Sequence, residues 1–383
     1  MRDIVLDAFS VGRPAYIVDQ NRSLEWLAEA HTWSEATRAG LSADGRREFG
    51  QMMRRRLARF GCDASKIGSR GGSVADVASE DWDSMTLYDV RRNPRGRGTT
   101  ARMAVFARVV DDYFAAEYAG VDMPPGDLVH VTCTGYVAPS AAQELVAKRG
   151  WGAQTRVVHA YHMGCNAAFP AVRIASGLLD GASDVDARVD VVHTEVASIH
   201  LDPSDHSAEQ LVVQSLFADG FVRYAVRATA DPDAPGLHIL AVDEAILPDS
   251  ESAMRWVIGD QGMHMTLSRD VPARIGTALR GFVVGLYARA GLDAIAALPG
   301  TIFAVHPGGP RIIDQVAEGL ELEPGQVAAS RQVLHEHGNM SSATLPHVWQ
   351  RLQGDRSVAS GTLIASLAFG PGLTICGGLF RKA

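Results

Sequence analysis

The sequence predicts an α/β protein built on a mostly buried sheet. Three short runs have the composition of strands, and each is followed by a stretch of small residues with helical spacing; the runs are 128–135 (LVHVTCTG), 156–162 (RVVHAYH) and 187–194 (ARVDVVHT). This alternation is typical of βαβ units, in which helices cover a sheet. The composition agrees, since 46% of the 383 residues are hydrophobic and 21% are charged, as in a globular protein with a large core.

Helices are expected on both sides of these strands. Apolar residues recur with helical spacing over 22–39, 43–60 and 99–119. The helices that follow the three strands are expected at 139–148, 165–179 and 206–216. Two consecutive strands, 221–229 and 236–247, then flank the turn DPDAPG, and the run RRNPRGR at 91–97 indicates an exposed loop.

A second half begins after this turn. It is expected to contain helices at 271–290, 310–319 and 341–352 and strands at 301–307, 362–370 and 372–380. A glycine precedes a helix of small residues in both halves, at Gly164 and at Gly338. We therefore divide the chain into two related halves, 1–235 and 236–383.

Charge and hydropathy restrict the class of protein. The net charge of −8 argues against wholesale binding to nucleic acid. The chain has no apolar run of about 18 residues and no signal-peptide pattern, so we expect a cytoplasmic protein without a membrane partner.

Cysteine and histidine patterns point away from disulfides and metals. The four cysteines are scattered and form no CxxC pair, so we expect free thiols; they are Cys62, Cys133, Cys165 and Cys376. Two histidine pairs lack HExxH spacing, so no metal site is expected; they are His159 with His162 and His335 with His337.

Cys165 is the candidate nucleophile. It stands where a strand is expected to end and a helix to begin, and free N–H groups at a helix N-terminus would lower its pKa. The small neighbours Ala167 and Ala168 would leave room for an acyl group. The alternative is a buried packing residue, because free cysteines are among the most buried residue types.

Two further segments supply the partners of such a nucleophile. HPGGP places His306 at a strand end beside two glycines, and HGNMSSA places Asn339 at an expected helix start. A thiol, an imidazole and an amide can together form a thioester, polarise a carbonyl and stabilise an enolate. Papain-like proteases also use Cys, His and Asn, but their signature around the cysteine is absent.

These motifs together resemble one family. GCNAAFPAVR, FADG, HPGGPRIIDQV, EHGNMSSATL and FGPGLTI, in this order, are similar to the type III polyketide synthases, the chalcone-synthase-like branch of the thiolase superfamily. VGRPAYIVDQ and RRLARFGCDASKI also fit, so the resemblance covers nearly the whole chain, and GCNA looks closer to bacterial than to plant members.

The resemblance implies a five-layered αβαβα thiolase fold with two similar halves and a homodimer. It implies that Cys165 carries an acyl chain as a thioester, while His306 and Asn339 drive decarboxylation of a malonyl-type extender and hold the enolate. A charge-assisted pair of Cys165 and His306 would keep the nucleophile ionised. The resemblance implies no metal or redox cofactor, because the substrates arrive as thioesters of coenzyme A or of a phosphopantetheinyl carrier.

Departures from the family concern the substrate cavity. Leu201 and Met265 fall near the two gatekeeping phenylalanines of plant members, and Ala138 near a methionine that reaches across the dimer. These changes predict a cavity that is wide or shaped for an aliphatic chain; ordinary variation in the core is the alternative. Cys133 falls at the cavity wall as a second thiol or as a buried structural residue, and Glu195 is expected to be a buried structural acid.

A basic cluster is the candidate for phosphate contacts. It contains Arg54, Arg55, Arg56, Arg59, Lys66 and Arg70. Such a cluster would bind the phosphates of coenzyme A or dock an acidic acyl carrier protein. The alternative is a solvated helix face paired with its own carboxylates.

The sequence therefore predicts a decarboxylative Claisen condensing enzyme. It would load an acyl group on Cys165 and condense it with a malonyl- or β-ketoacyl thioester. A variant joins two carrier-protein-bound chains and ends in an α-pyrone. An acyltransferase that keeps the fold and Cys165 but forms no carbon–carbon bond is the alternative, and Asn339 weighs against it because the amide is needed chiefly for enolate chemistry.

Overall fold

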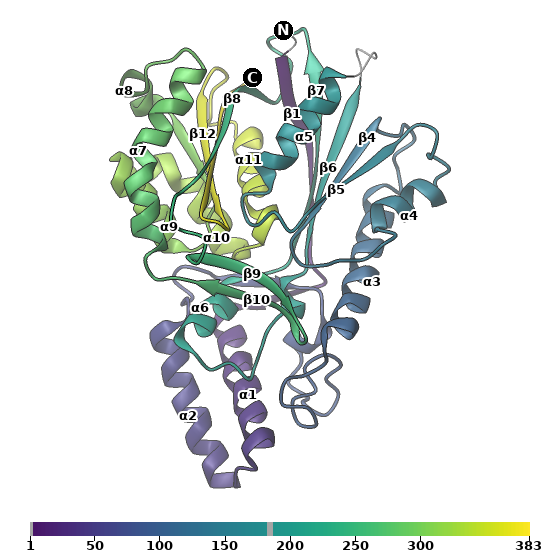
Figure 1. Ribbon diagram of the computed structural model, residues 1–383, viewed down its shortest axis with the longest axis vertical. Coiled ribbons are helices and arrows are strands. Elements are labelled where there is room, and N and C mark those ends of the chain that lie inside the picture. The colour runs from purple at the N-terminus through teal and green to yellow at the C-terminus, as the bar shows by residue number, and fades with distance from the viewer. Residues whose placement is uncertain (1–2, 182–186) are drawn as a thin grey trace.

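A mixed sheet of nine strands forms the frame of the molecule (Figure 1). The structure, a computed structural model, describes residues 3–181 and 187–383. The strand order is β11-β12-β13-β8-β1-β7-β6-β4-β5. The strands are β1 (Asp3–Gly12), β4 (Asp127–Thr132), β5 (Arg156–Tyr161), β6 (Arg188–Glu195), β7 (Gly220–Thr229), β8 (Leu237–Ile246), β11 (Ile302–Val305), β12 (Leu363–Gly370) and β13 (Thr374–Lys382).

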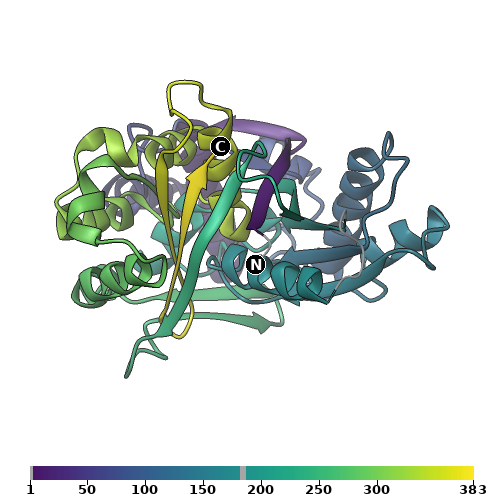
Figure 2. The ribbon, with the colours of Figure 1, turned by 90° about the horizontal axis from the view of Figure 1, so that it is seen from above.

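The sheet consists of two wings. β1 and β8 join them through two residue pairs only, Val5 with His238 and Leu6 with Leu237, whereas β1 pairs with β7 along its whole length. The strands of each wing come from one side of the predicted division at 235/236, although that boundary itself stays a prediction. Viewed from above, the N-terminal wing and the C-terminal wing extend to opposite sides of the molecule (Figure 2).

Helices lie between and outside the wings. α5 (Ala168–Asp180) and α11 (Thr344–Gly354) share one hydrophobic core with strands of both wings. α3 (Thr99–Glu117) and α4 (Ala141–Lys148) cover the N-terminal wing, and α7 (Val271–Arg289) and α9 (Pro310–Leu320) cover the C-terminal wing. This gives the five layers αβαβα that the sequence predicted.

Small residues allow α5 to fill the central layer. Ala168, Ala171 and Ala175 are all fully buried, so the helix can approach strands on two sides. Close packing of this kind needs short side chains where backbones come near one another. The same small residues place the N-terminal end of α5 at the junction of the two wings.

α1 (Gln20–Ala39) and α2 (Ala43–Phe60) form a hairpin that projects from the body (Figure 1). Asp19 caps α1 by accepting hydrogen bonds from two backbone N–H groups, and Ser42 caps α2. Gly40 ends α1 with φ 63°, a conformation that glycine adopts without strain. α6 (Ala208–Leu216) packs against this hairpin.

The remaining elements are short. They are β2 (Tyr16–Asp19), β3 (Ser69–Gly72), β9 (Met254–Gly259), β10 (Gly262–Leu267), α8 (Ala294–Ala297) and α10 (Ala328–His337). β2 pairs with β3, and β9 pairs with β10 as a hairpin. The 91–97 segment is a loop, as expected.

The sequence reading located most helices and strands but missed several. It missed β1, β2, β3, α10 and the β9–β10 hairpin, and it began α5 at Cys165 although the helix begins at Ala168. β9 and β10 are half-exposed ribbons without a clean alternation of apolar and polar residues, so their pattern is weak. In the part of the chain that the structure describes, no single helix is long and apolar enough to cross a membrane; one bent pair, α7 with the segment 294–300, passes by length and composition.

Candidate active site

The nucleophile lies where motifs from the two halves meet. Gly164 has φ 90°, and a Cβ there would collide with Pro371 of the FGPG motif. A Cβ on Gly370 of the same motif would collide with the side chain of Asn166. These close approaches explain Gly164 before Cys165 and Gly370 in the facing FGPG motif, and they fix the turn that carries the nucleophile.

Cys165 is a buried, protonated thiol in this structure. It is 8% exposed, and its Sγ lies 3.8 Å from Oγ of Ser341. Burial raises the pKa of the thiol to about 12, the contact with Ser341 opposes that rise, and the charge of Glu195 adds to it. The expected lowering by a helix N-terminus is therefore wrong for this conformation, because α5 begins three residues later and loss of water dominates.

Asn339 is held in one orientation by its neighbours. Its Oδ1 accepts hydrogen bonds from the backbone N–H of Ser341 at 2.9 Å and from Oγ1 of Thr344 at 3.4 Å. Its Nδ2 therefore points the other way and donates to the carbonyl oxygen of Gly308 at 3.2 Å. One N–H of the amide remains for a ligand beside the HPGGP segment.

His306 presents an imidazole without a partner. The ring is 2% exposed, and neither Nδ1 nor Nε2 has a hydrogen-bond partner among the residues that the structure describes. Burial lowers the pKa of His306 to about 3, so the ring is neutral. The expected charge-assisted pair with Cys165 is therefore not formed here; a neutral ring can instead accept the thiol proton when substrate binds. The ring lies about a van der Waals contact from Gly308, the residue that receives the Asn339 amide.

Ser341 connects these groups, and the sequence reading missed it. Its backbone N–H bonds to Asn339 and its hydroxyl contacts Cys165. Its φ of 50° is unusual for a residue with a side chain, a conformation that costs free energy and recurs at functional sites. Its position two residues after Asn339 in HGNMSSA was the available signal.

Cys133 and Glu195 form the wall behind the nucleophile. Sγ of Cys133 accepts the N–H of Gly164 at 3.1 Å, and the residue is buried; its role as a second thiol or as a structural residue stays a prediction. The Glu195 carboxylate accepts hydrogen bonds from the Cys133 N–H, from Thr134 and from Ser342. Burial raises the pKa of Glu195 to about 7 against these hydrogen bonds, and burial also raises the pKa of Cys133.

Aromatic rings from three elements line the same region. The indole Nε1 of Trp256 in β9 donates to the carbonyl oxygen of Cys133 at 2.6 Å. Its ring lies 6.5 Å from Phe217, nearly parallel, and 5.8 Å from His200, edge-on. Trp256 was not predicted, because it comes from the hairpin that was missed, whereas Phe217 belongs to the FADG motif.

The predicted cavity residues fall in different places. Met265 is buried in β10 and pairs directly with Trp256 of β9. An aromatic ring therefore lies next to this aliphatic side chain. Leu201 is buried and borders a separate hollow. Ala138 is exposed in the loop before α4. The cavity that these departures predict, wide or shaped for an aliphatic chain, stays a prediction.

The basic cluster does not act as one surface. Arg54 is paired with Glu25 and Glu29, as the alternative interpretation predicted. Arg70 is buried, and Arg56 is half-buried and donates to a backbone carbonyl. Three members remain exposed without a carboxylate within 4.0 Å in the described part of the chain; they are Arg55, Arg59 and Lys66.

Histidine, cysteine and carboxylate side chains are the usual ligands of a metal ion. Within residues 3–181 and 187–383, no group of three or more His, Cys, Asp or Glu side chains is placed to hold a metal ion. The expectation of a metal-free site stays a prediction.

Comparisons with known proteins identify the family. The family model described as chalcone and stilbene synthases, N-terminal domain, matches residues 122–232, and the corresponding C-terminal domain matches 238–383. Bisdemethoxycurcumin synthase of rice, Oryza sativa subsp. japonica, is 32% identical over 263 residues, which are 66% of this chain and 65% of the rice enzyme. A Dictyostelium discoideum protein named probable polyketide synthase 1 is 31% identical over 258 residues, which are 66% of this chain and 8% of that protein.

Solved structures show the same fold. The C-terminal type III polyketide synthase domain of Steely1 from Dictyostelium superposes with a TM-score of 0.81 at 23% identity, over 99% of both chains. PKS-I from the brown alga Ectocarpus siliculosus superposes with a TM-score of 0.84 at 23% identity, over 100% of this chain and 99% of that chain. The chain covers less than two thirds of the curated relatives' lengths, but both family models match it in order. The chain therefore has the thiolase fold and belongs to the chalcone and stilbene synthase family of type III polyketide synthases.

Proposed function

We propose that this protein is a decarboxylative Claisen condensing enzyme that carries its acyl chain on Cys165. The observation that carries the proposal is a chain of contacts: Ser341 links the buried Cys165 thiol to Asn339, and the Asn339 amide bonds to Gly308 in the HPGGP segment that carries His306. Asn339 has a fixed amide with one N–H available, and His306 has both ring nitrogens free in a site closed to water. Groups arranged in advance around a developing oxyanion are the usual source of stabilisation in acyl transfer.

Loading comes first. The Cys165 sulfur attacks the thioester carbonyl, the new carbon–sulfur bond forms, and the bond to the sulfur of coenzyme A or the carrier breaks. The thiol proton passes through neutral His306 to the departing sulfur, which leaves as a thiol. The raised pKa of Cys165 makes such a base necessary.

Condensation follows decarboxylation of the extender. The bond between the carboxylate carbon and the α-carbon breaks, CO₂ leaves, and the electron pair forms an enolate whose oxygen receives hydrogen bonds from His306 and Asn339. The enolate carbon then attacks the thioester on Cys165, the carbon–carbon bond forms, and the thiolate is released. Only the enolate step needs the amide, so Asn339 favours condensation over plain acyl transfer.

Intact-protein mass spectrometry tests the proposal. A panel of acyl-CoA and acyl-carrier thioesters is incubated with the wild type and with Cys165→Ala, and CO₂ release from malonyl-CoA is measured in parallel. The proposal expects a covalent adduct on the wild type alone, together with CO₂ release. Labelling of Cys165→Ala would contradict it, and labelling of the wild type without CO₂ release from any extender would favour the acyltransferase.

The carrier-protein partner is the finer part of this proposal. Arg55 and Arg59 lie one turn apart on the exposed face of α2, and Lys66 follows the helix. Carrier docking would depend on long-range attraction to this face, so Arg55→Glu with Arg59→Glu should lower the association rate for an acyl-carrier donor, and salt should weaken it in the wild type. Reversal of Arg280 and Arg289 on α7 is the matched control; equal effects on acyl-CoA and acyl-carrier donors would contradict carrier docking.

A homodimer is supported by the exposed edge of the sheet. β5 is the last strand of the N-terminal wing, and most of its residues are exposed or half-buried. The exposed Met163 follows it along the chain, and the ring of the exposed Tyr136 lies 5.9 Å from that of Tyr161 in β5. An unpaired strand edge needs cover, and a second copy of β5 would supply it with two-fold symmetry. Sedimentation should therefore give a dimer that Val158→Lys dissociates.

We extend the proposal to a cytoplasmic enzyme of the bacterial type without a cofactor, and to α-pyrone formation from two carrier-bound chains, which product analysis would test.

A further inference from the structure

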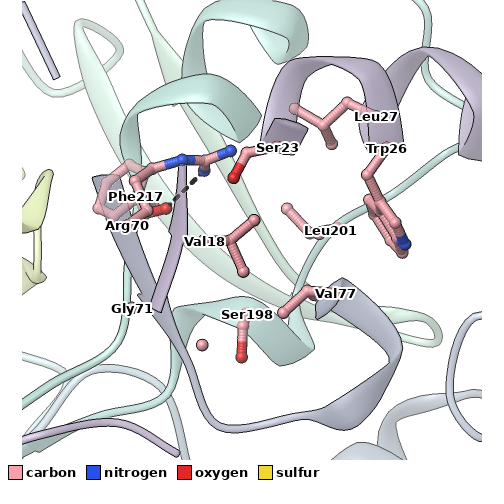
Figure 3. A pocket seen from close by; sticks show the side chains of 11 residues that line it. Val18, Ser23, Trp26, Leu27, Arg70, Gly71, Val77, Ser198, Leu201 and Phe217 are labelled. Atoms are coloured by element: carbon pink, nitrogen blue, oxygen red, sulfur yellow. Dashed lines mark hydrogen bonds between the residues drawn. The ribbon is translucent and has the colours of Figure 1, made fainter. Parts of the chain in front are cut away.

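A hollow borders Phe217 and contains none of the three proposed catalytic residues (Figure 3). It holds about 400 Å³ of space between atoms, its open mouth included. Its walls are mostly apolar and come from β2, α1 and the segments around them; they are formed by Val18, Trp26, Leu27, Val77, Leu201 and Phe217. Apolar walls with a few polar groups are typical of sites for small organic ligands.

One wall of the hollow is a buried cation. Arg70 is 9% exposed and donates hydrogen bonds to three neutral oxygens. These are Oε1 of Gln20 at 2.8 Å, the carbonyl of Gln214 at 2.7 Å and the carbonyl of Phe217 at 2.8 Å. Within the described residues no carboxylate lies within 4.0 Å of this guanidinium, although buried charges are normally paired; the charge of the buried Asp219 acts on it from farther away.

The polar groups of the hollow are separated from its apolar walls. Ser23 lies on the same side as the Arg70 guanidinium, whereas Ser198 lies at the opposite end, with Val18 and Leu201 between (Figure 3). Nε and Nη1 of Arg70 make the bonds to protein oxygens. Nη2 is therefore the nitrogen available to a ligand next to the Ser23 hydroxyl.

We propose that this hollow binds an aliphatic chain that ends in a carboxylate. The carboxylate would receive hydrogen bonds from Nη2 of Arg70 and from Ser23. Its negative charge would then pair with the positive charge of the guanidinium. The chain would lie against the apolar walls and reach Phe217, whose backbone pairs with Asn339. A free fatty acid and the far end of an ω-carboxylated acyl thioester present the same chemistry.

The proposal does not depend on the proposed condensing activity, so it is tested on Cys165→Ala as well as on the wild type. Isothermal titration calorimetry measures binding of octanoate, octanol and octyltrimethylammonium to the full chain. We expect octanoate to bind at least tenfold more tightly than octanol, the cation to bind weakest, and salt to reduce the difference. Equal binding of the three probes would overturn the proposal.

Two variants of the hollow make the test specific. Val77 lines the hollow and is only half-buried, so Val77→Phe should be tolerated by the fold while its larger ring occupies part of the hollow. The substitution should weaken octanoate binding at least tenfold. Val137→Phe is the matched control, since Val137 is also half-buried and lines a different hollow that contains Asp111 and Glu144 instead of an arginine. Octanoate affinity unchanged by Val77→Phe, or reduced equally by both variants, would overturn the assignment.

Arg70→Gln and a thioester pair complete the design. Arg70→Gln should abolish the preference for the acid over the alcohol; if it fails to fold, Val77→Phe decides. Decanedioyl-CoA is compared with decanoyl-CoA in wild-type labelling of Cys165. If the wild type prefers the dicarboxylic thioester and Val77→Phe loses this preference, the occupant is the end of an acyl chain. If octanoate binds, the occupant is a free acid. The absence of both results overturns the proposal.

Discussion

The orientation of the Asn339 amide leads to a prediction that separates the two chemical steps. Asn339→Asp keeps the oxygen that accepts from Ser341 and Thr344, so the side chain should stay in place. The substitution replaces the donor that faces Gly308 with a carboxylate oxygen. The perturbation therefore removes an N–H from the enolate site and adds a negative charge there, while Cys165 and its contacts are unchanged.

The size of the effect follows from the role of the lost donor. Removal of one oxyanion donor costs about a hundred- to a thousandfold in rate, and repulsion between the new carboxylate and the enolate acts in the same direction. Loss of the hydrogen bond to Gly308 costs about 1 kcal/mol of stability, and burial of the new charge costs roughly several kcal/mol more, so circular dichroism must show that the variant is folded. We therefore expect decarboxylation of malonyl-CoA to fall at least a hundredfold with Cys165 acylation within threefold of wild type.

The assay measures CO₂ release and the mass of the acylated protein on the same samples. Thr344→Val is the matched control, because it removes the longer hydrogen bond to Asn339 at 3.4 Å without touching the donor, and its decarboxylation should stay within a few-fold of wild type. Decarboxylation by Asn339→Asp at near wild-type rate, or a parallel loss of acylation, would refute the assignment of Asn339 to the enolate step.

Three further predictions concern the nucleophile, the aromatic wall and the buried acid. Cys165→Ala should lose the covalent adduct and all product while its circular dichroism and unfolding midpoint stay close to wild type, because the side chain has one weak polar contact. Trp256→Phe leaves the buried carbonyl of Cys133 without its donor and should cost about 1–3 kcal/mol in urea unfolding, whereas Trp256→Ala should also open the cavity and admit longer acyl chains in the labelling assay. The pKa of Glu195 lies near 7 in the folded protein against an ordinary 4.5, so ionisation opposes folding and wild-type stability falls as the pH rises from about 4.5 to about 7. Glu195→Gln should remove about 3 kcal/mol of this fall, measured by urea unfolding at several pH values, and an identical pH dependence in both proteins would show that Glu195 is not protonated on folding.

Sequence patterns located the elements that bury a regular face. The strands at 128–135 and 187–194 were recognisable because both of their faces are covered, so their residues are almost all buried and mostly apolar. β1 and the β9–β10 hairpin were missed. β9 and β10 are ribbons held by contacts distant in sequence, such as the hydrogen bond from Trp256 to Cys133, and local spacing carries no record of such contacts.

The sequence by itself determined the chemistry of the site as a set of residue types. Cys165, His306 and Asn339 stand in glycine-containing motifs, and the glycines are needed because backbone and side chains of the two halves pack closely there. Such a motif can be recognised in the sequence because a local backbone conformation requires its residue type, as φ 90° requires glycine at position 164.

Only the tertiary structure decided the electrostatics and the partners of these residues. A helix N-terminus and a neighbouring histidine predicted an ionised thiol, but burial raises the pKa of Cys165 and lowers that of His306, so both are neutral before substrate binds. The six basic residues of 54–70 looked like one patch, yet ion pairs from α1 and burial leave three of them exposed without a carboxylate partner in the described part of the chain. Charge and protonation depend on the loss of water and on neighbours brought together by folding, and a linear sequence does not contain these distances.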